Sequence, residues 1–193
     1  MPFDAQNEVS DEALLVAFGN GDRDAARILT ARLTPRVLGY STRILGDRAE
    51  AEDVAQEAML RLWRIAEEWR QGEAKVSTWL YRVVANLCTD RLRKKRGVGL
   101  DTIAEPIDEA PGAEAGMVQA QRQAALNAAL QTLPERQRQA VVLRHIEGVS
   151  NPEIAELMEI SVEAVESLTA RGKRVLAKTL AARREELGYS DDR

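Results

Sequence analysis

The sequence lacks the residues from which disulfide frameworks and metal sites are usually built. Cys88 is the only cysteine and His145 the only histidine in the 193 residues, so neither an internal disulfide nor a cluster of Cys and His ligands is possible. We therefore expect no metal site and no other cofactor. Aromatic residues make up only 4% of the chain, and alternating β-branched residues are missing. Ala, Leu, Arg and Glu dominate instead, which predicts an all-α fold.

Long hydrophobic runs are also missing. No apolar stretch approaches the ~20 residues that a membrane-spanning helix needs, so we expect no membrane insertion. The first residues, MPFDAQNEVSDE, are acidic and lack the basic segment and apolar core of an export signal. These absences predict a cytoplasmic protein.

One segment of the chain has the composition of a linker. Residues 97–116 contain four Gly, two Pro and five acidic residues, and no basic residue. Gly and Pro oppose helix formation and the like charges repel, which predicts a flexible acidic linker over residues 97–117. It separates two small helical domains, residues 1–96 and residues 118–187, and residues 188–193 form a tail.

The N-terminal half shows apolar residues at helical spacing. We expect a first helix to begin at Ser10 and Asp11, and a later helix within residues 50–69. In that later helix the buried stripe is predicted to be Val54, Ala58, Leu62, Ile65 and Trp69, with Asp53, Gln56, Glu57 and Arg64 on the opposite side. For the next helix, Ser77 is the candidate N-cap, and the core face is predicted to be Leu80, Val83, Val84 and Leu87.

This last helix ends in a concentration of positive charge, although the whole chain has a formal charge of −4. Residues 82–96 contain Arg82, Arg91, Arg93, Lys94, Lys95 and Arg96 against a single Asp90, a local charge of +5. Such a group can bind phosphates, and the nearby Trp79 and Tyr81 are suited to stacking with unpaired bases. The alternative is an ordinary solvated helix end.

The C-terminal half contains three predicted capped helix starts. Thr132 and Glu135 have capping-box spacing around Pro134, Ser150 and Glu153 repeat it, and Ser161 follows as a simple N-cap. Gly148 is predicted to end the first of these helices. Three capped starts in succession indicate a compact helical domain.

The last two helices fit a DNA-reading helix-turn-helix. Their predicted inner positions are Ile154, Ala155, Met158, Ile160, Val165 and Leu168. The second helix would place its outward residues at base edges and phosphates, namely Ser161, Glu163, Glu166, Ser167, Arg171, Lys173 and Arg174. Glu159 occupies the turn position that usually favours Gly, at a cost of about 1–2 kcal/mol if the turn is left-handed. The alternative is an ordinary helix pair whose late cations complement the helix dipole.

The order of these motifs resembles that of bacterial extracytoplasmic-function RNA polymerase sigma factors, over about residues 10–187. The stretch AEDVAQEAMLRLWR is similar to the polymerase-binding helix of that family, and VSTWLYRVVANLCTDRLRKKR to its promoter-melting helix. The stretch from LPERQRQAVV to ARGKRVL is similar to its domain that reads the −35 promoter element.

The resemblance implies a specificity subunit that is not itself an enzyme. It implies contact with the β′ clamp helices of core RNA polymerase through Asp53, Gln56, Glu57, Leu60 and Trp63. It implies −10 DNA binding through Trp79, Arg82, Asn86, Arg91, Arg93 and Lys94, with Asn86 holding a flipped-out base. It also implies contact of the C-terminal domain with the β flap, a linker running towards the RNA exit channel, and an anti-sigma protein as a controlling partner. Glu166 stands where many relatives carry Lys or Arg, so the −35 sequence is not predicted.

Two other functions fit parts of the pattern. A stand-alone helix-turn-helix regulator would explain the C-terminal half, but not the DVAQEAMLRLW helix followed by an aromatic and basic helix. A nucleic-acid enzyme could use Asp53 and Glu57 to hold a metal, but the sequence positions no third ligand beside them. A surface acidic face is the simpler interpretation of these two carboxylates.

Overall fold

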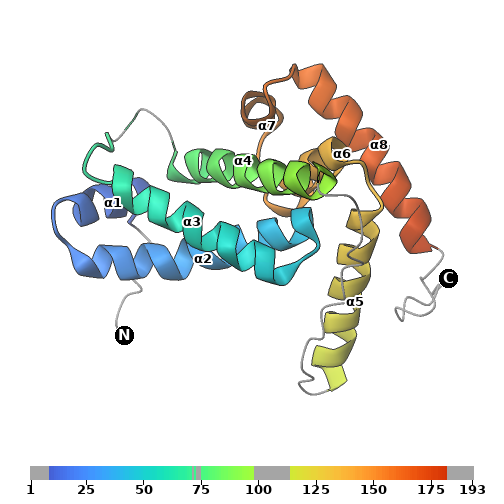
Figure 1. The fold of residues 1–193 in the computed structure, drawn as a ribbon, viewed down its shortest axis with the longest axis horizontal. Coiled ribbons are helices and arrows are strands. Elements are labelled where there is room, and N and C mark those ends of the chain that lie inside the picture. Colours follow the sequence, from blue (N-terminus) through green and yellow to red (C-terminus); the bar gives the residue numbers. More distant parts are fainter. Residues whose placement is uncertain (1–8, 71, 73–74, 98–113, 182–193) are drawn as a thin grey trace. The chain divides into compact units, whose positions relative to one another are not determined.

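The structure, a computed structural model, describes residues 9–70, 72, 75–97 and 114–181, the last range with side chains from residue 119. Helices account for all its regular elements, which confirms the predicted all-α fold (Figure 1). They are α1 (Asp11–Gly19), α2 (Arg23–Leu45), α3 (Arg48–Ile65), α4 (Val76–Gly97), α5 (Glu114–Gln131), α6 (Glu135–Val141), a π-helical turn (Val142–Ile146), α7 (Asn151–Met158) and α8 (Val162–Ala181).

The described residues form two compact units. The first contains residues 9–41 and 49–97, and the second contains residues 42–48 and 114–181. Most of the expected linker, residues 98–113, lies outside the described part of the chain, as does the expected tail. The two ends of that expected linker are helical, because α4 includes Gly97 and α5 begins at Glu114. Helix α5 therefore begins inside the expected linker, in a stretch where Glu, Ala and Met favour helix.

The core of the first unit forms where the apolar faces of α2, α3 and α4 meet. From α3 it takes Ala51, Val54, Ala55, Ala58, Met59 and Leu62, and from α4 it takes Val76, Leu80, Tyr81, Val84 and Cys88. Tyr81 packs edge-to-face on Tyr40 of α2, with 5.6 Å between ring centroids. This contact buries Tyr81, so the prediction that its ring serves unpaired bases is wrong.

Three sequence predictions for this unit need correction. The stripe of α3 ends at Leu62: Ile65 is half-buried and ends the helix, and Trp69 lies beyond it. The core face of α4 includes Leu80 and Val84 as predicted, but Val83 and Leu87 are only half-buried, because Tyr81 and Cys88 take the inner positions. Ser77 is not the N-cap, since α4 already begins at Val76.

The second unit confirms two of the three predicted caps. Ser150 and Glu153 form a capping box, and the Ser161 hydroxyl accepts a hydrogen bond of 3.2 Å from the Ala164 amide. The capping box predicted for Thr132 is wrong. The Thr132 hydroxyl donates to the Ala129 carbonyl and so completes the end of α5, while Pro134 precedes α6 without a side-chain cap.

The helix-turn-helix pair α7–α8 has the predicted inner residues Ile154, Ala155 and Val165 fully or almost fully buried. Met158, Ile160 and Leu168 are half-buried, and Leu157 is buried in addition. Gly172 lets α8 approach α6 closely, because a Cβ atom there would lie 2.5 Å from Cγ2 of Val141. Close packing therefore fixes where α8 presents its outer face.

Glu159 adopts the left-handed conformation, with φ 53° and ψ 50°, and is the only residue other than Gly with positive φ in the described part of the chain. We expect Glu159→Gly to stabilise the pair by about 1 kcal/mol, because Gly has no Cβ to strain. Amide hydrogen exchange in α7 and α8 should slow by about fivefold.

The matched control is Glu156→Gly, at an exposed position inside α7. This change should destabilise the helix pair by about 1 kcal/mol and accelerate amide hydrogen exchange in α7 and α8. Faster exchange in Glu159→Gly as well would show that the left-handed turn carries no strain.

Candidate functional site

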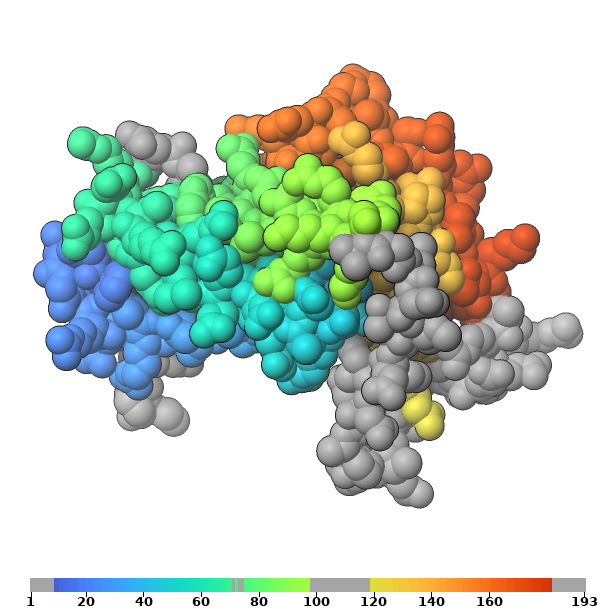
Figure 2. All heavy atoms as spheres, viewed as in Figure 1, coloured from blue at the N-terminus to red at the C-terminus, as the bar shows by residue number. Residues whose placement is uncertain are grey.

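The outward side of α4 carries most of the residues predicted to bind −10 DNA. Trp79, Arg82, Asn86 and Arg93 recur at intervals that place them on one side of a helix with 3.6 residues per turn. Arg82, Asn86, Arg93 and Lys94 are exposed, whereas Trp79 is half-buried. Figure 2 shows this part of α4, in green, at the surface of the molecule. The helix therefore separates an apolar inner face from a polar outer one.

Trp79 belongs to an aromatic pair that the sequence did not predict. Its ring lies edge-to-face against Trp69, with 6.3 Å between centroids. Trp69 comes from the segment after α3, which is described except for residues 71 and 73–74. The pair places two half-buried indole rings at the start of α4, and an aromatic ring that is partly exposed is suited to stacking with a base.

The positive charge at the end of α4 is partly compensated. Arg93 pairs with Asp90 one turn earlier at 2.7 Å, in an exposed contact. Arg91 reaches α3, where its Nη1 atom contacts the Glu50 carboxylate and lies 3.6 Å from Oδ2 of Asp53. The hydrogen bond to Glu50 raises the pKa of the Arg91 guanidinium further. Arg91 is therefore engaged with carboxylates of another helix.

The start of α4 is held by a residue distant in sequence. The Val76 amide donates a hydrogen bond of 3.0 Å to Oε1 of Glu12, which comes from α1. Burial alone would raise the pKa of Glu12, but hydrogen bonds from its own amide, from Val76 and from Ser10 lower it. Glu12 thus satisfies a free amide at the positive end of the α4 dipole, the role expected of Ser77.

The predicted docking residues lie on the exposed side of α3. Asp53, Gln56 and Leu60 are exposed, and Leu60 has 44% of its surface free, which is high for a large apolar residue. The hydrogen bond from Arg61, 2.8 Å long, lowers the pKa of Glu57. Trp63 is half-buried against Phe18, with 5.0 Å between ring centroids. The arrangement provides carboxylates beside one exposed leucine, a combination suited to a basic protein surface.

The outer face of α8 changes sign along its length. Glu163 and Glu166 are exposed in its first half, and Arg171, Lys173 and Arg174 in its second half, with Ser167 half-buried between them. Hydrogen bonds from its own amide and from Ser161 lower the pKa of Glu163, so this carboxylate is charged at neutral pH. Burial, Lys173 and Arg144 lower the pKa of His145, which is therefore neutral at pH 7.

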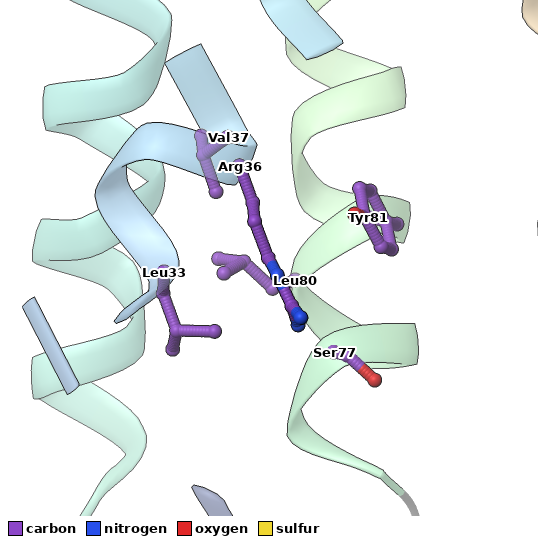
Figure 3. A pocket seen from close by; sticks show the side chains of 6 residues that line it. All are labelled: Leu33, Arg36, Val37, Ser77, Leu80 and Tyr81. Carbon is purple, nitrogen blue, oxygen red and sulfur yellow. The ribbon is translucent and has the colours of Figure 1, made fainter. Parts of the chain in front are cut away.

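A small pocket lies between α2 and α4. Its lining residues are Leu33, Arg36, Val37, Ser77, Leu80 and Tyr81 (Figure 3). Most of this lining is apolar, so the pocket lacks the set of converging polar groups that binds a polar ligand. In the described ranges we also find no group of three His, Cys, Asp or Glu residues that could hold a metal ion, and no helix long and apolar enough to cross a membrane.

Both units match families of known proteins. The family model of sigma-70 region 2 matches residues 29–98, and that of sigma-70 region 4 matches residues 123–176. The RNA polymerase sigma-H factor of Pseudomonas aeruginosa is 32% identical over 183 residues, covering 88% of this chain and 93% of that protein. The ECF RNA polymerase sigma factor SigM of Mycobacterium tuberculosis is 34% identical, covering 92% of this chain and 88% of that protein.

The chain belongs to the ECF sigma factors of the sigma-70 family. As a sigma factor it is a promoter-recognition subunit that binds RNA polymerase and directs initiation at promoter DNA. Its region 2 match spans most of α2 and all of α3 and α4, and its region 4 match runs from α5 into α8.

Solved structures show the same fold. CnrH, solved in complex with the cytosolic domain of CnrY, has a TM-score of 0.64 and 25% identity, covering 89% of this sigma factor and 97% of that chain. The sigma factor RpoE from Bartonella quintana, solved with the anti-sigma factor NepR, has a TM-score of 0.62 at 18% identity. The match covers 79% of this chain and 94% of that chain.

The Glu12 cap leads to a prediction about pH. We expect Glu12→Gln to destabilise the first unit by about 0.5–1 kcal/mol at pH 7, because a charged acceptor is replaced by a neutral one. The lowered pKa makes the carboxylate stabilising above its ordinary value of 4.5, and this contribution is lost as the pH falls through the lower folded-state value. Wild type and variant should therefore converge towards pH 3.

Urea unfolding followed by tryptophan fluorescence measures this, since Trp63, Trp69 and Trp79 all lie in the first unit. Glu67→Gln, at an exposed residue just after α3, is the control. Its free energy of unfolding should equal that of wild type at both pH 7 and pH 3. Equal stability of wild type and Glu12→Gln at pH 7 would refute the cap.

Proposed function

We propose that the two faces of the first unit serve different partners of this sigma factor. The exposed side of α3, with Asp53, Gln56 and Leu60, binds the β′ clamp helices of core polymerase. The outward side of α4, with Trp79, Arg82, Asn86, Arg93 and Lys94, binds the −10 element. The observation that carries this proposal is the two-sided character of α4, whose inner face is fully committed to the core while its outer face is polar and aromatic.

The proposed strand opening is energetically feasible. Unstacking a base costs a few kcal/mol, and stacking it on an aromatic surface returns about 1–3 kcal/mol. Trp79 offers such a surface, and the exposed Asn86 amide can both donate to and accept from a base edge. Because the two terms nearly cancel, opening needs no ATP hydrolysis when polymerase holds the sigma factor in place.

The second unit supplies the −35 contact and a contact with the β flap. Arg171, Lys173 and Arg174 reach phosphates, while the earlier part of α8 faces base edges. Glu163 and Glu166 repel phosphate, but a carboxylate there can accept a hydrogen bond from cytosine N4. The acidic half of α8 therefore contributes base selection, and the basic half contributes affinity.

An anti-sigma protein completes the proposed function. CnrH was solved with the cytosolic domain of CnrY bound to it, so a related chain of this fold accepts a protein partner. The exposed Leu60 among the carboxylates of α3 is a surface that free sigma factor leaves uncovered. A partner that covers this surface prevents docking on polymerase.

Replacing both Asp53 and Gln56 by Ala should weaken binding to core polymerase by about 30-fold or more, since a few residues carry most of the binding energy of an interface. Both side chains are exposed, so the fold should be retained. Fluorescence titration of labelled sigma factor with core polymerase measures the affinity. Asp24→Ala, at a carboxylate of α2 that is 81% exposed, is the control. Normal core binding by the double variant would contradict the docking assignment.

Asn86→Ala and Arg171→Ala separate the two promoter contacts. On a complete promoter, holoenzyme with Asn86→Ala should form open complexes about tenfold less readily, the effect of losing hydrogen bonds worth about 1.4 kcal/mol. On a duplex containing only the −35 element it should bind normally, whereas Arg171→Ala should bind that duplex more weakly. Permanganate footprinting and filter binding measure the two effects. The reverse pattern would refute the assignment of both elements.

A further inference from the structure

The ion pair between Arg91 and α3 gives this residue a different role from its cationic neighbours. Its guanidinium contacts the Glu50 carboxylate, and Oδ2 of Asp53 lies 3.6 Å away. The side chains of Arg91 and Glu50 are only 29% and 33% exposed, whereas Arg93 is 75% exposed. Arg91 is thus a half-buried link between two helices, while Arg93 is mostly exposed and pairs with Asp90 of its own helix.

The carboxylate contacts argue against a phosphate contact by Arg91. Its guanidinium already contacts Glu50 and lies close to the carboxylate of Asp53. A phosphate that bound Arg91 would have to displace a carboxylate from the guanidinium. Arg93 and Lys94, in contrast, are exposed and belong to the basic end of the helix.

The end of α4 needs an anchor because its apolar contacts end early. Cys88 is the last fully buried residue of the helix, and Leu92 is only half-buried. The final turn carries Lys94, Lys95 and Arg96, whose like charges repel although the helix dipole favours them. Arg91 lies between Cys88 and this turn, at the point where a link to another helix restrains fraying most effectively.

We propose that Arg91 is a positioning residue, which fixes the cationic end of α4 to the first turns of α3 so that Arg93 and Lys94 meet the promoter backbone. This inference rests on the proposed placement of α4 against DNA. The same link joins the DNA-binding helix to the helix proposed to bind polymerase, so docking of α3 also sets the position of the cations.

A double-mutant cycle with a salt titration tests this role. Holoenzymes containing wild type, Arg91→Ala, Glu50→Gln or both changes are compared for promoter affinity over a range of salt concentrations. Arg91→Ala and Glu50→Gln should each weaken promoter binding by about three- to tenfold. The double variant should bind no more weakly than the weaker-binding of the two single variants, because both changes remove the same interaction. Their plots of log affinity against log salt should run parallel to that of wild type, because Arg93 and Lys94 still reach the phosphates in the complex and the affinity is lost to the cost of ordering the helix end.

Lys94→Ala is the matched control, because it removes an exposed cation from the same helix end. Its salt slope should be shallower by about 0.9 for one lost phosphate contact with duplex DNA. Cooperative urea unfolding of Arg91→Ala, followed by tryptophan fluorescence, shows that the first unit is folded. In the free protein, Arg91→Ala and Glu50→Gln should accelerate amide exchange in residues 92–97 equally.

The outcomes distinguish this inference from the function on which it rests. A shallower salt slope in Arg91→Ala together with normal affinity of Glu50→Gln would mean that Arg91 binds a phosphate, and would overturn the proposal. Wild-type affinity and wild-type exchange in Arg91→Ala would overturn it too. If Lys94→Ala left the slope unchanged, the placement of α4 on DNA would fail, while coupled loss of exchange protection would still support the anchor.

Discussion

The packing of Tyr81 on Tyr40 fixes the rotation of α4 about its own axis, and the functional surfaces of the first unit depend on that rotation. Each residue along an α-helix turns by about 100°. Because Tyr81, Val84 and Cys88 point into the core, Arg82 and Asn86 must point outward. A shift of the inner face by one residue would bury a cation and expose an apolar side chain, at a cost of several kcal/mol.

Charge is arranged along this framework in a way that the total of −4 does not reveal. Carboxylates gather on the exposed side of α3, while cations gather at the end of α4 and in the second half of α8. The link from Arg91 to Glu50 and Asp53 joins the acidic surface to the basic one. An acidic protein can therefore bind a polyanion, because its cations are concentrated at the end of α4 and in the second half of α8, apart from the carboxylates of α3.

Local features were predictable from the sequence, and features that depend on distant residues were not. The caps at Ser10, Ser150 and Ser161 follow from residues within one turn, and the structure has all three. Ser77 failed as a cap because Glu12, which lies 64 positions before Val76, accepts the hydrogen bond of the Val76 amide instead. The outward face of α4 was largely predictable from its polar residues. The burial of Tyr81 and the engagement of Arg91 were not, because their partners Tyr40 and Glu50 are each 41 positions away in the chain.

Site-specific photocrosslinking in a promoter complex tests the central claim most directly, namely that α4 presents DNA-binding residues outward while α3 presents polymerase-binding residues. A photoreactive side chain is placed at position 86 in one sample and at position 60 in another, both exposed positions of the first unit. The account predicts a crosslink from position 86 to the −10 strand and from position 60 to the β′ subunit. Crosslinks from position 86 to protein alone, or from position 60 to DNA, would contradict it.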